Sequence, residues 1–297
     1  MLNLNHYRGE DSYSDGEIEE EILALVSNRK DFEEVIARDN RWPILYHLSP
    51  ERRNLLEWFP FRSDATLLEV GAGCGALTGL FCERVKRVVA VELSQRRARI
   101  TAERYRDTSN LEIIVGNVEE IPLAESFDYI TLIGVLEYAK SFISTTDPYG
   151  RLFDILLPRL REDGTVVIAI ENRFGLKYWA GAADDHTGRL FEAISTPVPG
   201  KQFETFSRQG LISLLRRNGL CDLHFYYPHP DYKLPQEIFS DAYLPGLTSL
   251  LDEAPCYDRA GLRLFDERFG FFYLIQDGMY PWFANSFLVL ARRGEER

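Results

Sequence analysis

Cysteine is scarce in this chain of 297 residues, and its four copies show no metal-binding spacing. No two of them form a Cys-x-x-Cys pair, so neither a zinc site nor any other metal site is expected. The sequence also lacks an apolar run near the roughly 20 residues of a membrane span. Its first residues lack the apolar core of a signal peptide. These absences predict a soluble protein of the reducing cytoplasm.

Positive charge is in deficit, with 34 Lys and Arg against 46 Asp and Glu and a formal net charge of −12. Because contacts to phosphates supply most of the affinity for nucleic acids, this balance argues against a nucleic-acid substrate. The only visible basic cluster, residues 96–99, lies on a predicted helix and is interpreted as a solvated face. The remaining composition is typical of a soluble globular protein.

Glycine is concentrated in residues 67–78, which read Leu-Leu-Glu-Val-Gly-Ala-Gly-Cys-Gly-Ala-Leu-Thr. A short apolar run predicts a buried strand, and Gly71, Gly73 and Gly75 then precede a helical pattern. Glycine lets the backbone turn sharply and approach a ligand, so this is the plan of a nucleotide-type site. Glu69 ends the strand, where a carboxylate would repel a pyrophosphate but suits the positive charge of S-adenosylmethionine.

Strands and helices alternate beyond the glycines. The predicted strands are residues 67–70, 88–91, 111–115, 127–133 and 165–170. Five strands separated by helices predict a doubly wound, Rossmann-like parallel sheet of the α/β class. Ligands of such a sheet bind at the carboxyl ends of the strands. We therefore expect the residues that follow these strands to form the site.

Glu92 ends the second strand, 17 residues after Gly75, where an acidic side chain accepts hydrogen bonds from both hydroxyls of a ribose. The alternative is that Glu92 caps the helix that follows. Asn117 ends the third strand, and its amide can pair with an adenine edge. The same predicted cofactor site includes Ala72, Leu93, Val118 and Gly134.

Residues 1–60 are predicted to form a helical cover of three helices, with Trp42-Pro43 breaking the second. The linker 44–49 carries Tyr46, which either folds over a bound cofactor or packs in the core. The sequence favours neither of these two positions of Tyr46 over the other. Tyr46 is therefore included in the predicted cofactor site.

Residues 61–297 are predicted as one domain with two insertions on its substrate side. The first, about 171–206, is dense in aromatic, glycine and ionisable residues, as functional loops often are. The second, about 228–281, contains six prolines. Strands at 222–227 and 285–291 are expected to close the sheet.

In order along the chain, these features resemble the motifs of class I S-adenosylmethionine-dependent methyltransferases. The matching residues are Glu69-x-Gly71-x-Gly73-x-Gly75, Glu92 and Gly116-Asn117. The resemblance covers about residues 60–291 and implies a seven-stranded sheet whose last strand is antiparallel. It implies S-adenosylmethionine as the cofactor. An Asp is common where this chain has Asn117, and the amide still reaches the adenine amino group.

A narrower resemblance is to a bacterial subgroup whose members are fused to, or encoded beside, glycosyltransferases of surface-polysaccharide assembly. It rests on residues 132–138, 170–181, 185–188 and 226–235. It implies a sugar or glycan acceptor and a glycosyltransferase as a partner.

Methyl transfer is an in-line displacement, and a sugar hydroxyl gains from a general base. His186 is the predicted base, with Asp185 orienting its ring and Glu171 as the alternative base. The competing interpretation is a hydrogen-bonded loop without catalytic function. Four further residues are predicted to shape the pocket or stack on a sugar, with core packing as the alternative for the aromatic ones: Asn172, Tyr178, Trp179 and Tyr232.

The leading hypothesis is O-methylation of a glycan or sugar-containing acceptor. Its alternatives are methylation of a small molecule at N, C or phosphate, and a cofactor-binding partner subunit without catalysis. A nucleotide-sugar oxidoreductase is disfavoured by Glu69 and by the lack of a Tyr-x-x-x-Lys pair on a helix at the active face.

Overall fold

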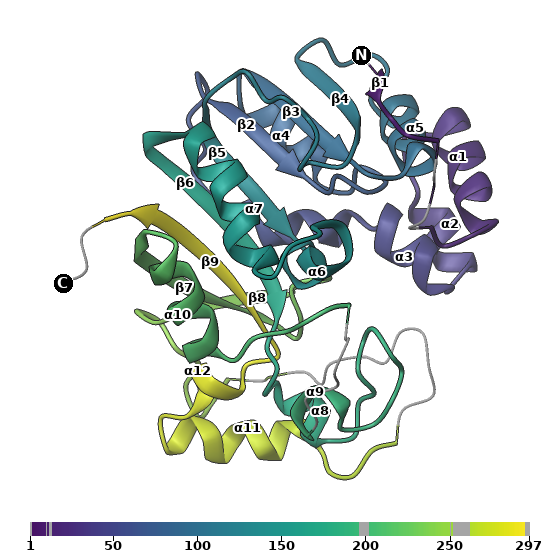
Figure 1. Ribbon diagram of the computed structural model, residues 1–297. Helices are drawn as coiled ribbons and strands as arrows, with labels where there is room; N and C mark the ends of the chain where they lie inside the picture. The colour runs from purple at the N-terminus through teal and green to yellow at the C-terminus, as the bar shows by residue number, and fades with distance from the viewer. Residues whose placement is uncertain are drawn as a thin grey trace. The chain divides into compact units, whose positions relative to one another are not determined.

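The computed structural model describes residues 2–9, 11, 14–195, 202–249, 251 and 262–294. The chain divides into two compact units, which are described separately below (Figure 1). The first comprises Met1–Ile133 and Asp154–Val166, and the second comprises Gly134–Phe153 and Val167–Arg297.

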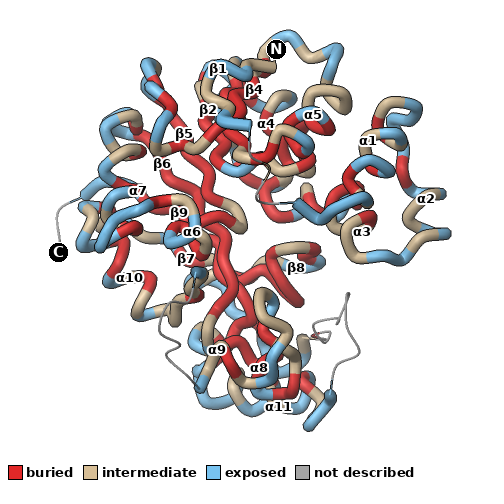
Figure 2. Tube along the Cα trace, turned by 45° about the vertical axis from the view of Figure 1, so that its right-hand side comes forward, coloured by how far each residue is buried: buried red, intermediate tan, exposed pale blue. Residues whose placement is uncertain are grey.

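Parallel strands form the sheet of the first unit. They are β1 (Leu2–His6), β2 (Thr66–Val70), β3 (Arg87–Glu92), β4 (Leu111–Gly116) and β5 (Phe127–Ile133). Their order is β1-β4-β3-β2-β5, and each neighbouring pair is parallel. The apolar runs of β2 to β5 are buried on both faces, as expected of a parallel sheet covered by helices (Figure 2).

Helices α4 (Thr78–Arg84) and α5 (Gln95–Arg104) connect the central strands. The N-terminal segment forms α1 (Ile18–Asn28), α2 (Glu33–Arg38), α3 (Trp42–Leu48) and the 3₁₀ helix η1 (Pro50–Leu55). A further 3₁₀ helix, η3 (Leu157–Arg159), precedes strand β6 (Leu160–Glu171). The second helix, α2, ends at Arg38, in line with the predicted break at Trp42-Pro43, but the linker predicted at residues 44–49 is wrong, because α3 covers Trp42–Leu48. Proline in a first helical turn sacrifices no hydrogen bond, since the N–H groups there have no partner within the helix.

Antiparallel pairing characterises the sheet of the second unit. The strands are the later part of β6 (Leu160–Glu171), then β9 (Ser286–Arg293), β7 (Leu220–His229) and β8 (Glu237–Ser240), in this order. Strand β7 pairs antiparallel with β9 and with β8. The helices of this unit are η2 (Leu136–Tyr138), α6 (Ala139–Phe142), α8 (Leu176–Trp179), α9 (Glu192–Ser195), α10 (Arg208–Arg217), α11 (Glu267–Gln276) and α12 (Tyr280–Phe283), with α7 (Pro148–Leu156) shared by both units.

The predicted α/β fold with a doubly wound, mostly parallel sheet is confirmed, but its strand count is not. In the described residues the sheet contains nine strands instead of seven. The additional ones are the edge strands β1 and β8. The predicted closing strands correspond to β7 and β9. No helix in the described part of the chain combines the length and apolarity needed to cross a bilayer.

Candidate functional site

The turn after β2 has a left-handed backbone at each of its three glycines. The φ angles are +75° at Gly71, +57° at Gly73 and +77° at Gly75. Residues with a Cβ atom rarely adopt such angles, so glycine is required for this path. The Gly71 N–H donates to the carbonyl of Val91 at 2.8 Å, which joins the turn to the end of β3. The turn is thereby part of the sheet edge where ligands of this fold bind.

Helix α5 fixes the turn from one side. The hydroxyl of Thr101 donates to the carbonyl of Gly73 at 2.9 Å, and the hydroxyl of Tyr105 donates to the carbonyl of Gly75 at 2.7 Å. A Cβ atom at Gly75 would lie 2.9 Å from the Tyr105 ring, so this side is closed. A Cβ atom at Gly73 would meet no atom within 4 Å. The open space at Gly73 is therefore where a ligand can approach the backbone.

Glu92 ends β3 with a buried carboxylate that accepts two backbone hydrogen bonds. Gly73 N donates to its Oε2 at 2.7 Å and Ser94 N donates to its Oε1 at 2.9 Å. A carboxylate has about four acceptor positions, so Glu92 retains capacity for two ligand hydroxyls. Burial raises its pKa, in opposition to these hydrogen bonds. The cap of α5 is Ser94, whose side chain accepts from Arg97 N, so the alternative of Glu92 as the helix cap is not what the structure shows.

Glu69 is buried beneath the turn. The Thr78 hydroxyl donates to its Oε2 at 2.7 Å, which ties β2 to the start of α4. Burial raises the pKa of Glu69 to about 8. Its charge at neutral pH therefore depends on what lies beside it, and a cationic group would favour the carboxylate.

The other predicted cofactor residues in the first unit lie around the same strand ends. Ala72 N donates to the Val91 carbonyl at 3.2 Å. The Asn117 side chain accepts from Glu119 N at 3.0 Å and so shapes the turn after β4. Val118 is buried and Leu93 is half-buried. These positions fit an adenosyl group. The carboxylate oxygens of Glu92 can accept hydrogen bonds from the ribose hydroxyls, and the backbone at Gly73 is open to the ligand.

Tyr46 lies on α3, where its ring packs against Trp42 at 5.1 Å and under the Arg52 guanidinium at 4.4 Å. The linker predicted for this segment is a helix, so Tyr46 packs within the helical cover. Gly134 directly follows β5 and belongs to the second unit.

A buried ionic cluster attaches the helical cover to α5. Arg97 contacts Asp15 and Glu19, each at 2.8 Å, and His47 Nε2 lies 3.1 Å from the same Asp15. Interpreting residues 96–99 as a solvated face is wrong for Arg97, whose exposed fraction is 8%. Burial lowers the pKa of His47, so the neutral imidazole is favoured.

The hydrophobic core of the cover includes Cys74 of the glycine turn. It packs with residues of α1, α3 and α5, among them Ile22, Leu48 and Ile100. Arg104 adds hydrogen bonds to the carbonyls of His47 and Cys74, at 2.9 and 3.4 Å. The cover is therefore bonded to the turn itself.

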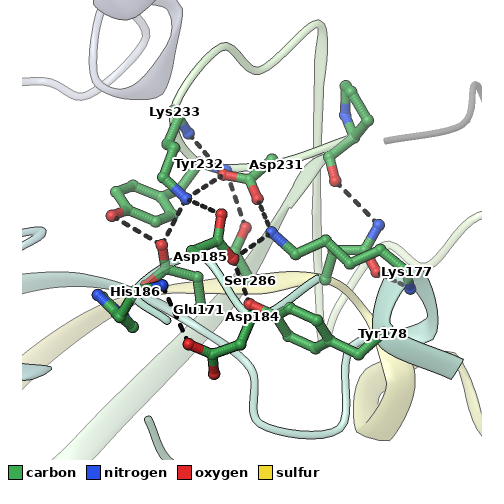
Figure 3. A network of polar contacts seen from close by, with 12 residues as sticks. Glu171, Lys177, Tyr178, Asp184, Asp185, His186, Asp231, Tyr232, Lys233 and Ser286 are labelled. Carbon is green, nitrogen blue, oxygen red and sulfur yellow. Dashed lines mark hydrogen bonds and ion pairs between the residues drawn. The ribbon is translucent and has the colours of Figure 1, made fainter. Parts of the chain in front are cut away.

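A network of charged side chains lies in the second unit, with Glu171, Lys177 and Asp231 buried, Lys233 half-buried and Asp185 more exposed (Figure 3). Lys233 is paired with Glu171 at the end of β6 and lies 3.0 Å from Asp185 Oδ1. Lys177 on α8 lies 2.8 Å from Asp231 Oδ2 and 3.1 Å from Asp185 Oδ2. Three segments, the one after β6, the loop after α8 and the one after β7, are joined by these five side chains.

The two lysines and the two aspartates of this network stabilise one another's charged forms. Burial alone would raise the pKa of Asp185, but Lys177 and Lys233 hold it well below its usual range. Burial would lower the pKa of each lysine, but Asp185 and Asp231 raise both. All four groups are therefore ionised at neutral pH.

His186 has a different partner from the one predicted. Asp185 accepts from both lysines and from the Tyr178 hydroxyl and does not orient the imidazole. The His186 Nδ1 atom instead lies 3.0 Å from the Tyr138 hydroxyl, and its ring packs on Phe203 at 4.4 Å. Burial lowers the pKa of His186. Its Nε2 atom is buried and has no hydrogen-bond partner in the described residues.

Glu137 is a residue that the sequence analysis missed. It lies in η2, is 1% exposed, and its Oε2 has no hydrogen-bond partner within the described ranges. Burial and the neighbouring Glu171 raise its pKa well above the usual value. The only sequence signal was its place four residues after β5, at a strand end. No group of three His, Cys, Asp or Glu that could hold a metal ion occurs in the described part of the chain.

Known proteins share the strand–turn–helix core. A family model described as a methyltransferase domain matches residues 68–168. The matched segment contains the glycine turn, Glu92 and Asn117. The match with a methyltransferase domain confirms the predicted enzyme class and S-adenosylmethionine as the predicted cofactor.

Two solved methyltransferases share the fold of this chain. The N-methyltransferase NodS from Bradyrhizobium japonicum, in complex with S-adenosyl-L-homocysteine, is 13% identical with a TM-score of 0.52, covering 96% of this chain and 100% of that chain. Phosphoethanolamine N-methyltransferase 1 from Haemonchus contortus, in complex with phosphoethanolamine and S-adenosylhomocysteine, is 14% identical with a TM-score of 0.50, covering 94% and 50%. At these identities the likeness concerns the fold.

The sequence of this chain is also similar to that of a curated relative. Ribosomal RNA small subunit methyltransferase A from Geobacter metallireducens is 41% identical over 68 residues, which is 23% of this chain and 25% of that protein. This chain thus spans about a quarter of the relative's length. The match identifies a shared segment and does not extend to the acceptor.

The residues predicted to bind the acceptor differ in how far they are buried and in whether their polar groups are engaged. Asn172 is fully engaged, donating to the carbonyls of Trp282 and Ala284, each at 2.8 Å, and it holds a loop together instead of facing a ligand. Tyr178 is buried with its hydroxyl on Asp185. Tyr232 is buried and lies 3.4 Å from Glu171 Oε1 through its hydroxyl. Trp179 is exposed and available for stacking.

Proposed function

We propose that this chain is an S-adenosylmethionine-dependent O-methyltransferase whose acceptor is a glycan or a sugar-containing molecule. Binding of the methyl donor is supported by the glycine turn. Its backbone is open at Gly73, and the Glu92 carboxylate can accept further hydrogen bonds. When bound, S-adenosylmethionine supplies a methyl group activated by a sulfonium. The protein has to align the acceptor oxygen and remove its proton.

His186 is the residue that we propose for removing the proton. A neutral imidazole with an unengaged nitrogen is a general base near neutral pH. Burial lowers the pKa of His186, and its Nε2 atom has no partner in the described residues. With Tyr138 accepting from Nδ1–H, Nε2 carries the lone pair that accepts the proton. Glu171 is engaged by Lys233 and Tyr232, so we assign it to binding.

The proposed partners are a sugar acceptor and a glycosyltransferase, with the reaction in the cytoplasm. The exposed ring of Trp179 supports a sugar contact, since aromatic faces stack on sugars. Ribosomal RNA, named in the curated relative, is disfavoured because the net charge of −12 gives little attraction to phosphates.

The experiment that tests the proposal has a binding stage and a turnover stage. Calorimetry should detect S-adenosylmethionine and not NAD, and the reverse would overturn the donor assignment. Release of S-adenosylhomocysteine is then measured with nucleotide sugars, oligosaccharides, amines and carboxylates. We expect turnover with the sugars. Binding without turnover of any class would favour a cofactor-binding partner subunit.

A His186→Ala variant tests the base. We expect kcat to fall by roughly 10²- to 10⁴-fold, the usual contribution of a positioned base. His224→Ala is the matched control, because His224 is an exposed histidine on β7 of the same unit. Full activity of His186→Ala would indicate an acceptor that is already ionised, such as a carboxylate or phosphate, and would contradict the assignment.

A further inference from the structure

Two buried carboxyl oxygens of the second unit have no hydrogen-bond partner among the residues that the structure describes. They are Oε2 of Glu137 and Oε2 of Glu171, and each residue is 1% exposed. Leaving a buried carboxyl oxygen unpaired is unfavourable, and native structures contain few such atoms. Their occurrence together points to a ligand that supplies the missing hydrogen bonds.

The two carboxyl groups share one neighbourhood. Burial is the main cause of the raised pKa of Glu137, and the charge of Glu171 is the next. Gly134 has φ +68°, and a Cβ atom there would lie 3.0 Å from the Tyr232 hydroxyl and 3.7 Å from Glu137 Oε1. The same Tyr232 hydroxyl contacts Glu171 Oε1. Gly134 therefore leaves room between the side chains of the pair and Tyr232.

The surrounding charges determine what the pair can offer. Lys233 and Lys177 already compensate Asp185, Asp231 and Glu171, so three carboxylates share two cations. An ionised Glu137 would add a second uncompensated negative charge in a buried place, which is unfavourable. Glu137 is therefore the protonated member of the pair. It offers an O–H donor, while Glu171 offers an acceptor.

We propose that Glu137 and Glu171 form a subsite that binds a hydroxyl group of the acceptor, next to the hydroxyl addressed by His186. This inference rests on the proposed function. A hydroxyl both accepts from Glu137 and donates to Glu171, whereas an ammonium only donates and would lie near the Lys233 cation. The acceptor class is thus a polyol with at least two neighbouring hydroxyls, such as a sugar. Glu137 selects it over monohydric alcohols and amines.

Glu137→Ala and Glu137→Gln separate this role from a structural one. Release of S-adenosylhomocysteine is measured with monosaccharides, myo-inositol and oligosaccharides, and with a matched panel of primary amines. Loss of the donor in Glu137→Ala should lower kcat/KM for polyols by roughly 10- to 100-fold, mostly through KM. The Glu137→Gln amide still donates, so we expect activity within a few-fold of the parent. Glu237→Gln makes the same change at an exposed position and should have no effect.

Infrared spectroscopy provides a second measurement that requires neither turnover nor the alanine variant. Subtracting the Glu137→Gln spectrum from that of the parent removes the shared contribution of Glu69 and should leave a carboxylic-acid carbonyl band of Glu137, which shifts when myo-inositol is added. The proposal would be overturned if this band were missing or did not shift with any polyol. It would also be overturned by a preference for amines, or by an equal loss of kcat/KM for polyols in both Glu137 variants. Calorimetry with S-adenosylmethionine on the same samples distinguishes these outcomes from failure of the donor site, because the infrared band does not depend on the cofactor.

Discussion

The glycine turn of the first unit and the charge network of the second differ in how completely their polar groups are paired. The carbonyls of Gly73 and Gly75 are bonded by hydroxyls of α5, and both oxygens of Glu92 accept backbone N–H groups. In the second unit, buried atoms of Glu137, Glu171 and His186 have no partner among the described residues. Both regions are buried, so the difference does not come from solvent exposure.

This difference corresponds to two kinds of ligand. A site with a fixed ligand gains from complete preorganisation, because little has to be rearranged on binding. A site that recognises an acceptor by hydrogen bonds retains groups whose partners come from the acceptor. Such a site rejects molecules without those partners, since its own groups would then stay unpaired.

Lys177→Met tests whether the second region is held by its charges, and we expect the largest effect here. Removing this buried cation leaves Asp185 and Asp231 with less compensation. Breaking a buried ion pair from one side costs about 3–5 kcal/mol, so we expect the free energy of unfolding to fall by about 4 kcal/mol. Urea denaturation measures it.

Lys140→Met is the matched control for this prediction. Lys140 pairs with Glu204 nearer the surface, at a side-chain exposure of 35%. Exposed ion pairs contribute about 0–1 kcal/mol, so this variant should unfold close to the parent. Equal stabilities of the two variants would mean that the buried network does not stabilise the second unit.

The sequence predicted the first region well because its determinants are local. Alternating apolar runs specify parallel strands, and the spacing of Gly71, Gly73 and Gly75 specifies a left-handed turn. The carboxyl ends of parallel strands meet at one edge of the sheet, so the sequence alone assigns Glu92 and Asn117 to that edge. The start of α3 at Trp42-Pro43 was missed because proline is a helix breaker except in the first turn.

The second region was predicted only in part because its contacts connect distant segments. The distance along the chain from Asp185 to Lys233 is 48 residues, and no periodicity links them. Asp185 precedes His186 directly and seemed suited to orient it, but the two lysines attract its carboxylate more strongly than a neutral imidazole does. Glu137 was overlooked because a single acid at a strand end resembles a helix cap.

Gly75→Ala tests how tightly the first region is packed. The added Cβ atom would meet Tyr105 at 2.9 Å in a backbone with φ +77°, so strain and overpacking combine. We expect a loss of about 3 kcal/mol in the free energy of unfolding, together with loss of S-adenosylmethionine binding. Gly219→Ala has the same kind of backbone, φ +81°, with no atom within 4 Å. It should lose only the strain contribution of about 1 kcal/mol, and a similar loss in both variants would show that Tyr105 yields easily.

Glu69 provides the most specific test, because its carboxyl has the opposite titration behaviour to that of Asp185. Burial raises the pKa of Glu69 from 4.5 to about 8, whereas the lysines lower that of Asp185. Between pH 4.5 and about 8, Glu69 in the folded chain holds a proton that it has released in the unfolded chain. Stability from this group is therefore present below pH 4.5 and falls as the pH rises to about 8.

Glu69→Gln removes this titration, so the difference in unfolding free energy between parent and variant isolates it from the histidines. We expect the parent to lose about 1.4 kcal/mol per pH unit relative to the variant within that window, measured by urea denaturation of the ligand-free protein. Parallel pH profiles would mean that Glu69 is already ionised in the fold. The turn would then present its negative charge to a cation at all neutral pH values, and the uptake of S-adenosylmethionine would release no proton. With the raised pKa, binding the sulfonium instead favours the carboxylate and releases a proton near pH 7, an effect that Glu69→Gln should abolish in calorimetry across buffers of different ionisation enthalpy.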